Sequence, residues 1–215
     1  IGGLYSSTAT ISVLARKSRK ASEQEANEYV AAMLLAVSMM FLRFMILILI
    51  FSREIFTSIY PYLLIMSVVA AVVAWFIHSR HRRSKDMTDE SEDEDSSNPL
   101  EFKVALIFAT LFVVFTVLTH YTLVYAGTGG LNLLSFVSGL SDITPFILNL
   151  LQNTGSVAAL IITACSMQAI ISNIMVNMFY ALFFAGKGSK LRPWILGGFG
   201  VVIACNFVLL LFFYL

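Results

Sequence analysis

The chain has 215 residues, of which 58% are hydrophobic and 13% are charged, and its formal net charge at pH 7 is +1. Soluble domains average about 45–50% apolar and about 25% charged residues, so this composition excludes an ordinary soluble protein. It predicts an all-α integral membrane protein, a polytopic helical bundle whose main partner is the lipid bilayer, with no nucleic-acid partner.

From the N-terminus onward, five apolar runs reach the length of about 20 residues that a helix needs to cross a bilayer. They are residues 29–51, 59–78, 104–126, 156–185 and 194–215. Between the third and the fourth run, residues 127–154 are apolar but interrupted by glycine, aspartate and proline. We expect this stretch to enter the membrane and return to the same side. The alternative is that residues 131–152 cross as a further span.

Lysine and arginine are concentrated in three segments, and this predicts the orientation of the spans because cytoplasmic loops are enriched in these residues. The segments that we place in the cytoplasm are residues 16–28, 79–103 and 187–192. With a re-entrant stretch, 12 of the 14 basic residues lie inside, whereas a full crossing of residues 131–152 leaves nine inside. Charge therefore favours the re-entrant topology.

The segment 79–103 is basic in its first part and acidic in its second, with little apolar surface to bury. Such a charge run is typical of a solvated linker. It lacks the spacing of an EF-hand loop, so we assign it no metal site. The sequence is thus divided into a first unit, residues 1–78, this linker, and a second unit, residues 104–215.

The two units share a glycine-led, hydroxyl-rich phrase. The letters "GLYSST" at residues 3–8 resemble "GLSDIT" at residues 139–144, and further along a similar register sets Arg43 on Asn177. The units have opposite orientations in the favoured topology, which predicts an inverted repeat; the alternative is a coincidence of composition. A span precedes the phrase in the second unit, so we expect a corresponding helix ahead of Ile1.

Each phrase is expected to break a helix inside the membrane, where irregular backbone is tolerated only beside protein or a water-filled cavity. Gly139 permits the break in the second unit, and Pro145 suits a first helical turn because its missing N–H is not needed there. Asp142 or Thr144 can cap the helix that follows. Broken helices in inverted repeats are typical of secondary transporters and some channels, whose sites lie near the middle of the bilayer.

These patterns predict a path for a small ion or solute between the two broken helices. The residues that we place on it are Ser6, Ser7, Thr8, Arg43, Ser141, Asp142, Thr144, Asn173 and Asn177. In this hypothesis Asp142 carries a proton or a cation, and it is the one residue considered as a metal ligand. Its alternative role is to cap a helix. Arg43 either pairs with Asp142 or extends to the outer surface. Asn173 and Asn177 share a helix face.

The alternative function is a regulatory or scaffold module that transports nothing. A transporter needs a hydrated cavity joining residues 6–8 to Asp142, whereas a scaffold can pack this region shut. No HExxH, CxxC or Gly-rich phosphate motif occurs, so we expect neither an enzyme nor a cofactor. Cys165 and Cys205 lie in apolar runs and are expected to pack rather than form a disulfide. The last span carries small residues that suit close packing within the chain or in a homodimer: Gly197, Gly198, Gly200 and Ala204.

Three segments give the sequence a family resemblance: "GGLYSSTAT" with the following "LARKSR", then "NPLEFKVALIF", and then "SGLSD". Together they resemble the DUF4010 family, a membrane domain often fused to MgtC/SapB proteins, along essentially the whole chain. The resemblance implies a multi-pass protein of the bacterial inner membrane with no established substrate, and a hydrophobic helix ahead of the first phrase. Relatives tend to have a second carboxylate where this chain has Thr144 and a lysine where it has Asn177, so a strongly charged coupling site is not expected.

Overall fold

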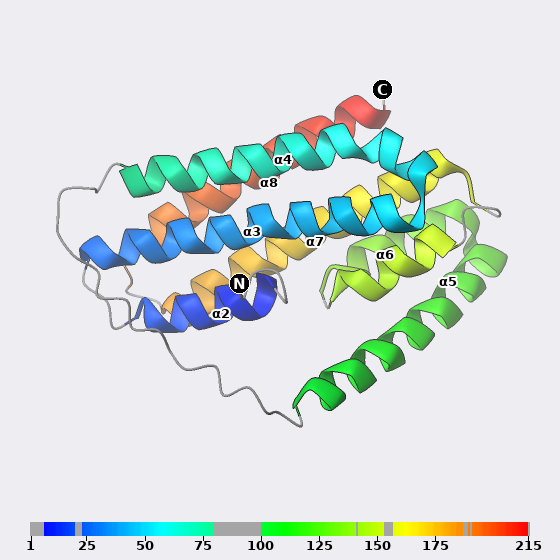
Figure 1. Cartoon of the computed structure of the whole chain (residues 1–215), viewed down its shortest axis with the longest axis horizontal. Helices are drawn as coiled ribbons and strands as arrows, with labels where there is room; N and C mark the ends of the chain where they lie inside the picture. The colour runs from blue at the N-terminus through cyan, green and yellow to red at the C-terminus, as the bar shows by residue number, and fades with distance from the viewer. Residues whose placement is uncertain are drawn as a thin grey trace.

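The computed structural model describes residues 7–19, 23–79, 100–140, 142–152, 157–186, 189 and 191–214, and all regular structure in these ranges is α-helical. The helices are α2 (Ser7–Lys17), α3 (Glu23–Phe51), α4 (Arg53–Ser79), α5 (Leu100–Ser138), α6 (Ile143–Gln152), α7 (Ala159–Ala185) and α8 (Arg192–Tyr214) (Figure 1). Five of them contain apolar stretches long enough to cross a membrane. The predicted fold class, an all-helical membrane protein, is confirmed.

The long helices α3 and α4 form an antiparallel hairpin with a turn at Ser52. The turn is tighter than the outer loop predicted between residues 51 and 59, because the Ser52 hydroxyl accepts the backbone N–H of Ile55 and starts α4 early. Deeper in the hairpin, the Ser38 hydroxyl donates to the carbonyl of Ser67 at 2.9 Å. Lipid tails are as apolar as the side chains, so burying apolar surface does little to hold two helices together in a membrane. Hydrogen bonds such as this one help to link them.

Helix α7 lies at the centre of the bundle and packs against α2, α4, α5, α6 and α8. Of its apolar stretch, 67% is buried, against 11% for the stretch Ala109–Gly127 of α5. Small side chains make this close packing feasible, since they let helix backbones approach one another. Buried small residues of α7 include Ala164, Cys165, Ser166, Ala169 and Ser172.

Helix α5 is kinked at Gly127, whose φ of 58° and ψ of −148° belong to a region that essentially only glycine adopts. Beyond the kink, the short helix Gly129–Ser138 is followed by α6, Ile143–Gln152. Each spans about 15 Å at 1.5 Å per residue, about half the thickness of the hydrocarbon core. Figure 1 shows that the chain enters the bundle along the first and returns to the same end along α6, as the re-entrant prediction requires.

Two sets of helices have the same order of lengths: α2 before α3 and α4, and α6 before α7 and α8. In Figure 1, α2 and α6 both begin near the middle of the bundle and run toward opposite ends. This arrangement favours the inverted repeat, which stays a prediction, as do the unit boundaries and the orientation in the membrane. Most of the predicted linker, residues 80–99, lies outside the described residues.

Candidate functional site

The site begins at the start of α6, where Asp142 caps the helix. Its Oδ1 atom accepts the backbone N–H of Thr144 at 2.9 Å and the Thr144 hydroxyl at 2.7 Å. A carboxylate in this position satisfies a backbone donor that no helical carbonyl can reach, and its charge interacts favourably with the positive end of the helix dipole. Pro145 occupies the first turn, as predicted.

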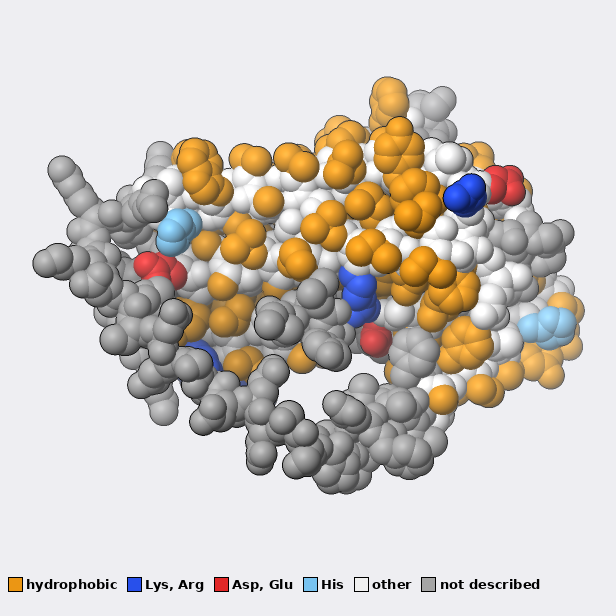
Figure 2. Space-filling model, in the orientation of Figure 1, with side chains coloured by type: hydrophobic (Ala, Val, Ile, Leu, Met, Phe, Trp, Pro, Cys, Tyr) orange, Lys and Arg blue, Asp and Glu red, His pale blue; other side chains and the backbone are white. Residues whose placement is uncertain are grey.

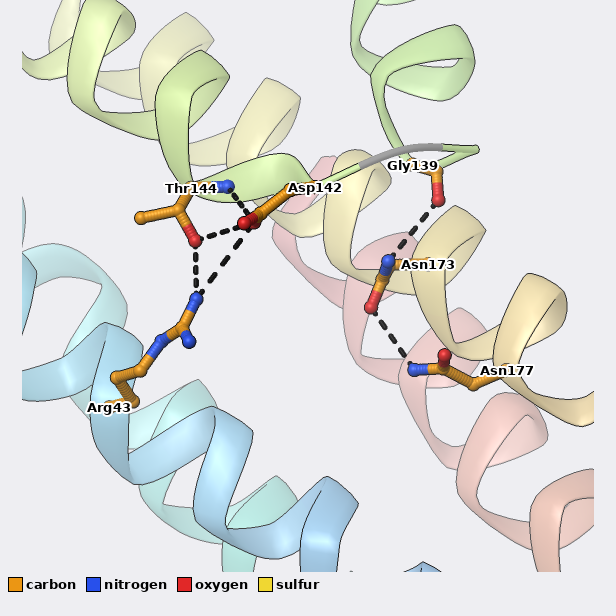
Figure 3. A network of polar contacts seen from close by, with 6 residues as sticks. All are labelled: Arg43, Gly139, Asp142, Thr144, Asn173 and Asn177. Carbon is orange, nitrogen blue, oxygen red and sulfur yellow. Dashed lines mark hydrogen bonds and ion pairs between the residues drawn. The ribbon is translucent and has the colours of Figure 1, made fainter. Parts of the chain in front are cut away.

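Arg43 reaches this cap from α3 (Figure 3). Its Nη2 atom lies 3.9 Å from Oδ1 of Asp142 and donates a hydrogen bond to the Thr144 hydroxyl. We call these three residues the charged bridge. The side chain of Arg43 is 24% exposed and that of Asp142 49%. The predicted pairing of Arg43 with Asp142 is confirmed. The cap contacts of Asp142, which the sequence analysis gave as the alternative to a carrier role, are also present.

The tip of the re-entrant hairpin is held against α7. The Asn173 side chain donates to the carbonyl of Gly139 at 3.2 Å, and the Ser172 hydroxyl donates to that of Phe136 at 2.6 Å. A Cβ atom on Gly139 would lie 2.3 Å from Cβ of Ser172 and 2.8 Å from the backbone nitrogen of Asn173. Glycine is therefore required here by the close approach of two backbones.

Asn177 lies one helical turn beyond Asn173 and donates to its Oδ1 atom at 3.2 Å (Figure 3). The Asn177 side chain is fully buried, and among the described residues its own Oδ1 has no hydrogen-bond partner. The two asparagines thus share a helix face, as predicted, and the second supports the first.

A cavity of about 510 Å³ lies beside the charged bridge. Its walls come from α2, α3, α7 and the re-entrant tip, and include Ser7, Thr8, Ser12, Arg16, Met40, Arg43, Phe44, Leu140, Asp142, Asn173, Val176, Tyr180 and Phe184. Figure 2 shows a basic and an acidic side chain next to each other near the middle of a mostly hydrophobic face.

The cavity brings together five of the predicted path residues, namely Ser7, Thr8, Arg43, Asp142 and Asn173. Thr144 is joined to them through the charged bridge, and Asn177 lies behind Asn173 rather than on the wall. Ser6 and Ser141 lie outside the described residues.

Arg16 is a cavity residue that the sequence analysis counted only as a marker of orientation. It follows Thr8 and Ser12 at intervals of four, which places the three side chains on one face of α2. Its guanidinium lies 4.4 Å from the centre of the Phe184 ring, so the ring holds the charge through a cation–π contact. The spacing of a basic residue behind two hydroxyls was the signal that could have found it.

Polar residues away from the cavity serve as links between helices. Tyr62 of α4 donates to Asn206 of α8, and Ser135 donates to Gln168 of α7 at 2.8 Å. Within the described ranges, no group of three histidine, cysteine, aspartate or glutamate side chains could hold a metal ion.

The chain is similar to proteins whose function is unknown. The family described as "Domain of unknown function (DUF4010)" matches residues 1–185. An uncharacterized protein of Aquifex aeolicus (strain VF5) is 26% identical over 194 residues, which cover 89% of this chain and 82% of that protein. No solved structure gives a significant match. Because the family match covers most of its length, the chain belongs to the DUF4010 family.

Proposed function

We propose that this protein moves a small ion or solute across its membrane through the cavity beside the charged bridge. The observation that carries the proposal is the position of that cavity, which lies between the re-entrant tip and α2 and has Arg43 and Asp142 on its wall. Both helices that begin there, α2 and α6, are too short to cross a bilayer.

The cost of charged groups supports this proposal. An ionised side chain within a membrane span is unfavourable by several kcal/mol and is retained mostly where it lines a pathway or pairs with another charge. Arg43 and Asp142 pair with each other, and both lie on the wall of the cavity. The irregular backbone at the tip supports it as well, since such backbone occurs at membrane depth only beside protein or water.

The charged bridge gives the path a point of control. It joins α3 to the re-entrant tip. A movement of the tip away from α3 separates Arg43 from Asp142 and Thr144, so we assign the bridge the role of a gate.

The test is flux into liposomes that contain the purified chain, with Na⁺, K⁺, Mg²⁺, H⁺ and small anions as the ions. Asp142→Asn removes the charge but keeps the shape of the cap, and we expect it to raise the flux of the transported ion at least tenfold, because it weakens the pair with Arg43 that holds the gate closed. The matched control is Glu54→Gln, which neutralises an exposed acid at the α3–α4 turn, outside the cavity. We expect that variant to match the wild type.

Two results would contradict the proposal. Flux that is the same in Asp142→Asn and in the wild type would remove the charged bridge from the path. A folded wild-type protein that moves none of the ions would instead favour the alternative, a regulatory or scaffold module.

A further inference from the structure

We infer that the ligand of the cavity is an anion, and specifically an oxyanion such as a carboxylate, phosphate or sulfate group. This inference rests on the proposed function, because it names the class of solute that follows the path. The sequence left the sign of the charge open, with Asp142 in favour of a cation and the broken helices in favour of an anion. The contacts of the charged groups now decide between them.

The first step is the charge of the wall. The described lining residues include two arginines, Arg16 and Arg43, and one acid, Asp142. The two guanidinium groups outnumber the single carboxylate, so the described part of the wall carries a net positive formal charge. A cation entering this space would meet net repulsion.

The second step is that one oxygen of Asp142 already has partners. Its Oδ1 atom accepts two hydrogen bonds from Thr144 and pairs with Arg43. A cation at Oδ1 would have to compete with these partners, and a hard divalent cation needs about six oxygen ligands, of which the described acids of the cavity wall supply only those of Asp142. Arg16 has a different setting: its guanidinium lies over the ring of Phe184, and no acidic side chain that the structure describes forms an ion pair with it.

The third step is a second basic hollow that adjoins the first. A groove of about 810 Å³ at the far ends of α2 and α7 shares Arg16 and Phe184 with the cavity and adds Arg19 and Arg192 to its lining. Arginines therefore follow one another from this groove to the charged bridge. Such a series raises the local concentration of anions and speeds their entry.

Gly186 lies on the wall of this groove beside Arg19. Gly186 has φ of +90°, and a Cβ atom there would lie 3.0 Å from Nε of Arg19. A side chain at this position would be strained and would press on the guanidinium, so the backbone leaves room for Arg19.

The type of cation on the wall points to an oxyanion. A guanidinium offers paired N–H groups that match two oxygens of a carboxylate, phosphate or sulfate. A volume of about 510 Å³ also exceeds the need of a bare monatomic ion and lies within the range of small-molecule sites.

The first experiment measures binding, so that it does not depend on transport. The full chain in detergent is heated in sodium phosphate, sulfate or acetate at constant ionic strength, and unfolding is followed by the fluorescence of Trp75 and Trp194. We expect a saturable rise of the midpoint with at least one oxyanion, because a ligand that binds the folded state stabilises it. Arg16→Gln should weaken the apparent affinity at least tenfold. Arg53→Gln, an exposed arginine outside both hollows, should not.

The comparison of variants also removes the general stabilising action of sulfate and phosphate, which is the same for all three proteins. A short-chain phosphatidylglycerol is added in a parallel series. If that lipid alone raises the midpoint and the free oxyanions do not, the site is a lipid headgroup site and the inference is overturned.

The second experiment repeats the flux assay with oxyanions and cations and with the same two variants. Oxyanion flux that falls at least tenfold in Arg16→Gln, but not in Arg53→Gln, supports the inference. If only cations are transported, the proposed transport function stands and the inference of an anionic ligand is overturned. If an oxyanion binds but is not transported, the anion site stands and the proposed transport is overturned. If there is neither binding nor flux, both the anion site and the transport proposal are overturned.

Discussion

The two half-length helices beside the cavity, α2 and α6, are held in different ways. The start of α6 is capped by Asp142, linked to α3 by Arg43 and anchored to α7 through Asn173 and Gly139. The cavity face of α2 carries the hydroxyls of Thr8 and Ser12 and then Arg16, with no acid among its described residues. One side of the cavity is thus a self-contained network, and the other carries the positive charge of Arg16, which we propose as the ligand-binding group.

The alignment of the two phrases shows where this difference arises. It sets Met39 of α3 on Asn173 of α7, and Arg43 on Asn177. In the second unit these positions hold the tip of their own unit. In the first unit the arginine instead reaches the tip of the other unit. The two predicted units thus contribute differently to the cavity: we call the network around α6 the fixed wall and the face of α2 the proposed ligand-binding wall.

The strongest way to break the fixed wall is Gly139→Ala. The added Cβ atom would overlap Ser172 and the backbone of α7, and neither is the flexible end of a long side chain. Overpacking of this kind costs about 1–3 kcal/mol, so we expect unfolding in detergent at a clearly lower denaturant concentration. The readout is the fluorescence of Trp75 and Trp194.

The matched control for that variant is Gly197→Ala in α8, where an added Cβ atom has nothing within 4 Å. Because alanine favours a helix by about 0.5–1 kcal/mol over glycine, this protein should be as stable as the wild type or more so. Equal stability of both variants would show that the tip does not rest on α7 as closely as described.

A smaller effect is expected from removing one hydroxyl on each wall. Thr144→Val removes the two hydrogen bonds of the Thr144 hydroxyl, the one that it donates to Asp142 and the one that it accepts from Arg43. The loss should be about 1–2 kcal/mol, since both partners carry charge. Thr8→Val changes a partly exposed cavity residue and should stay within about 0.5 kcal/mol. If chemical unfolding shows that both variants lose the same stability, the distinction between the fixed wall and the ligand-binding wall is contradicted.

Much of this fold could be predicted because the membrane limits the options. Apolar length gave all five spans to within a few residues, apart from the extra turns at the starts of α3 and α4. Those turns carry several charged and polar residues, which lower the mean apolarity of each segment. The re-entrant stretch followed from the distribution of lysine and arginine rather than from apolarity, and its two short helices agree with it.

The candidate site was predicted less evenly. Asp142 and Arg43 stood out because charge is rare inside spans, and they form a pair. Arg16 was missed because a basic residue near the end of a helix has an ordinary role in orientation and in balancing the helix dipole. Gly139 was predicted to permit a break in the helix. Its close approach to Ser172 could not be predicted, because this contact depends on packing between segments that are distant in the sequence.

The smallest effect concerns the amide pair that supports the tip. Asn173→Ala and Asn177→Ala remove the same number of atoms from the same buried face of α7. Only Asn173 holds the Gly139 carbonyl, whereas Asn177 makes one hydrogen bond to Asn173 and leaves its own Oδ1 without a partner among the described residues. Interhelical hydrogen bonds in membranes average about 0.6 kcal/mol, so Asn173→Ala should be less stable than Asn177→Ala by about that amount.

The double variant should lose less stability than the sum of the two single variants, because the hydrogen bond between Asn173 and Asn177 is counted twice in the single variants. Strict additivity, or a larger loss at Asn177, would mean that Asn177 supports the cavity wall by another contact than the one through Asn173.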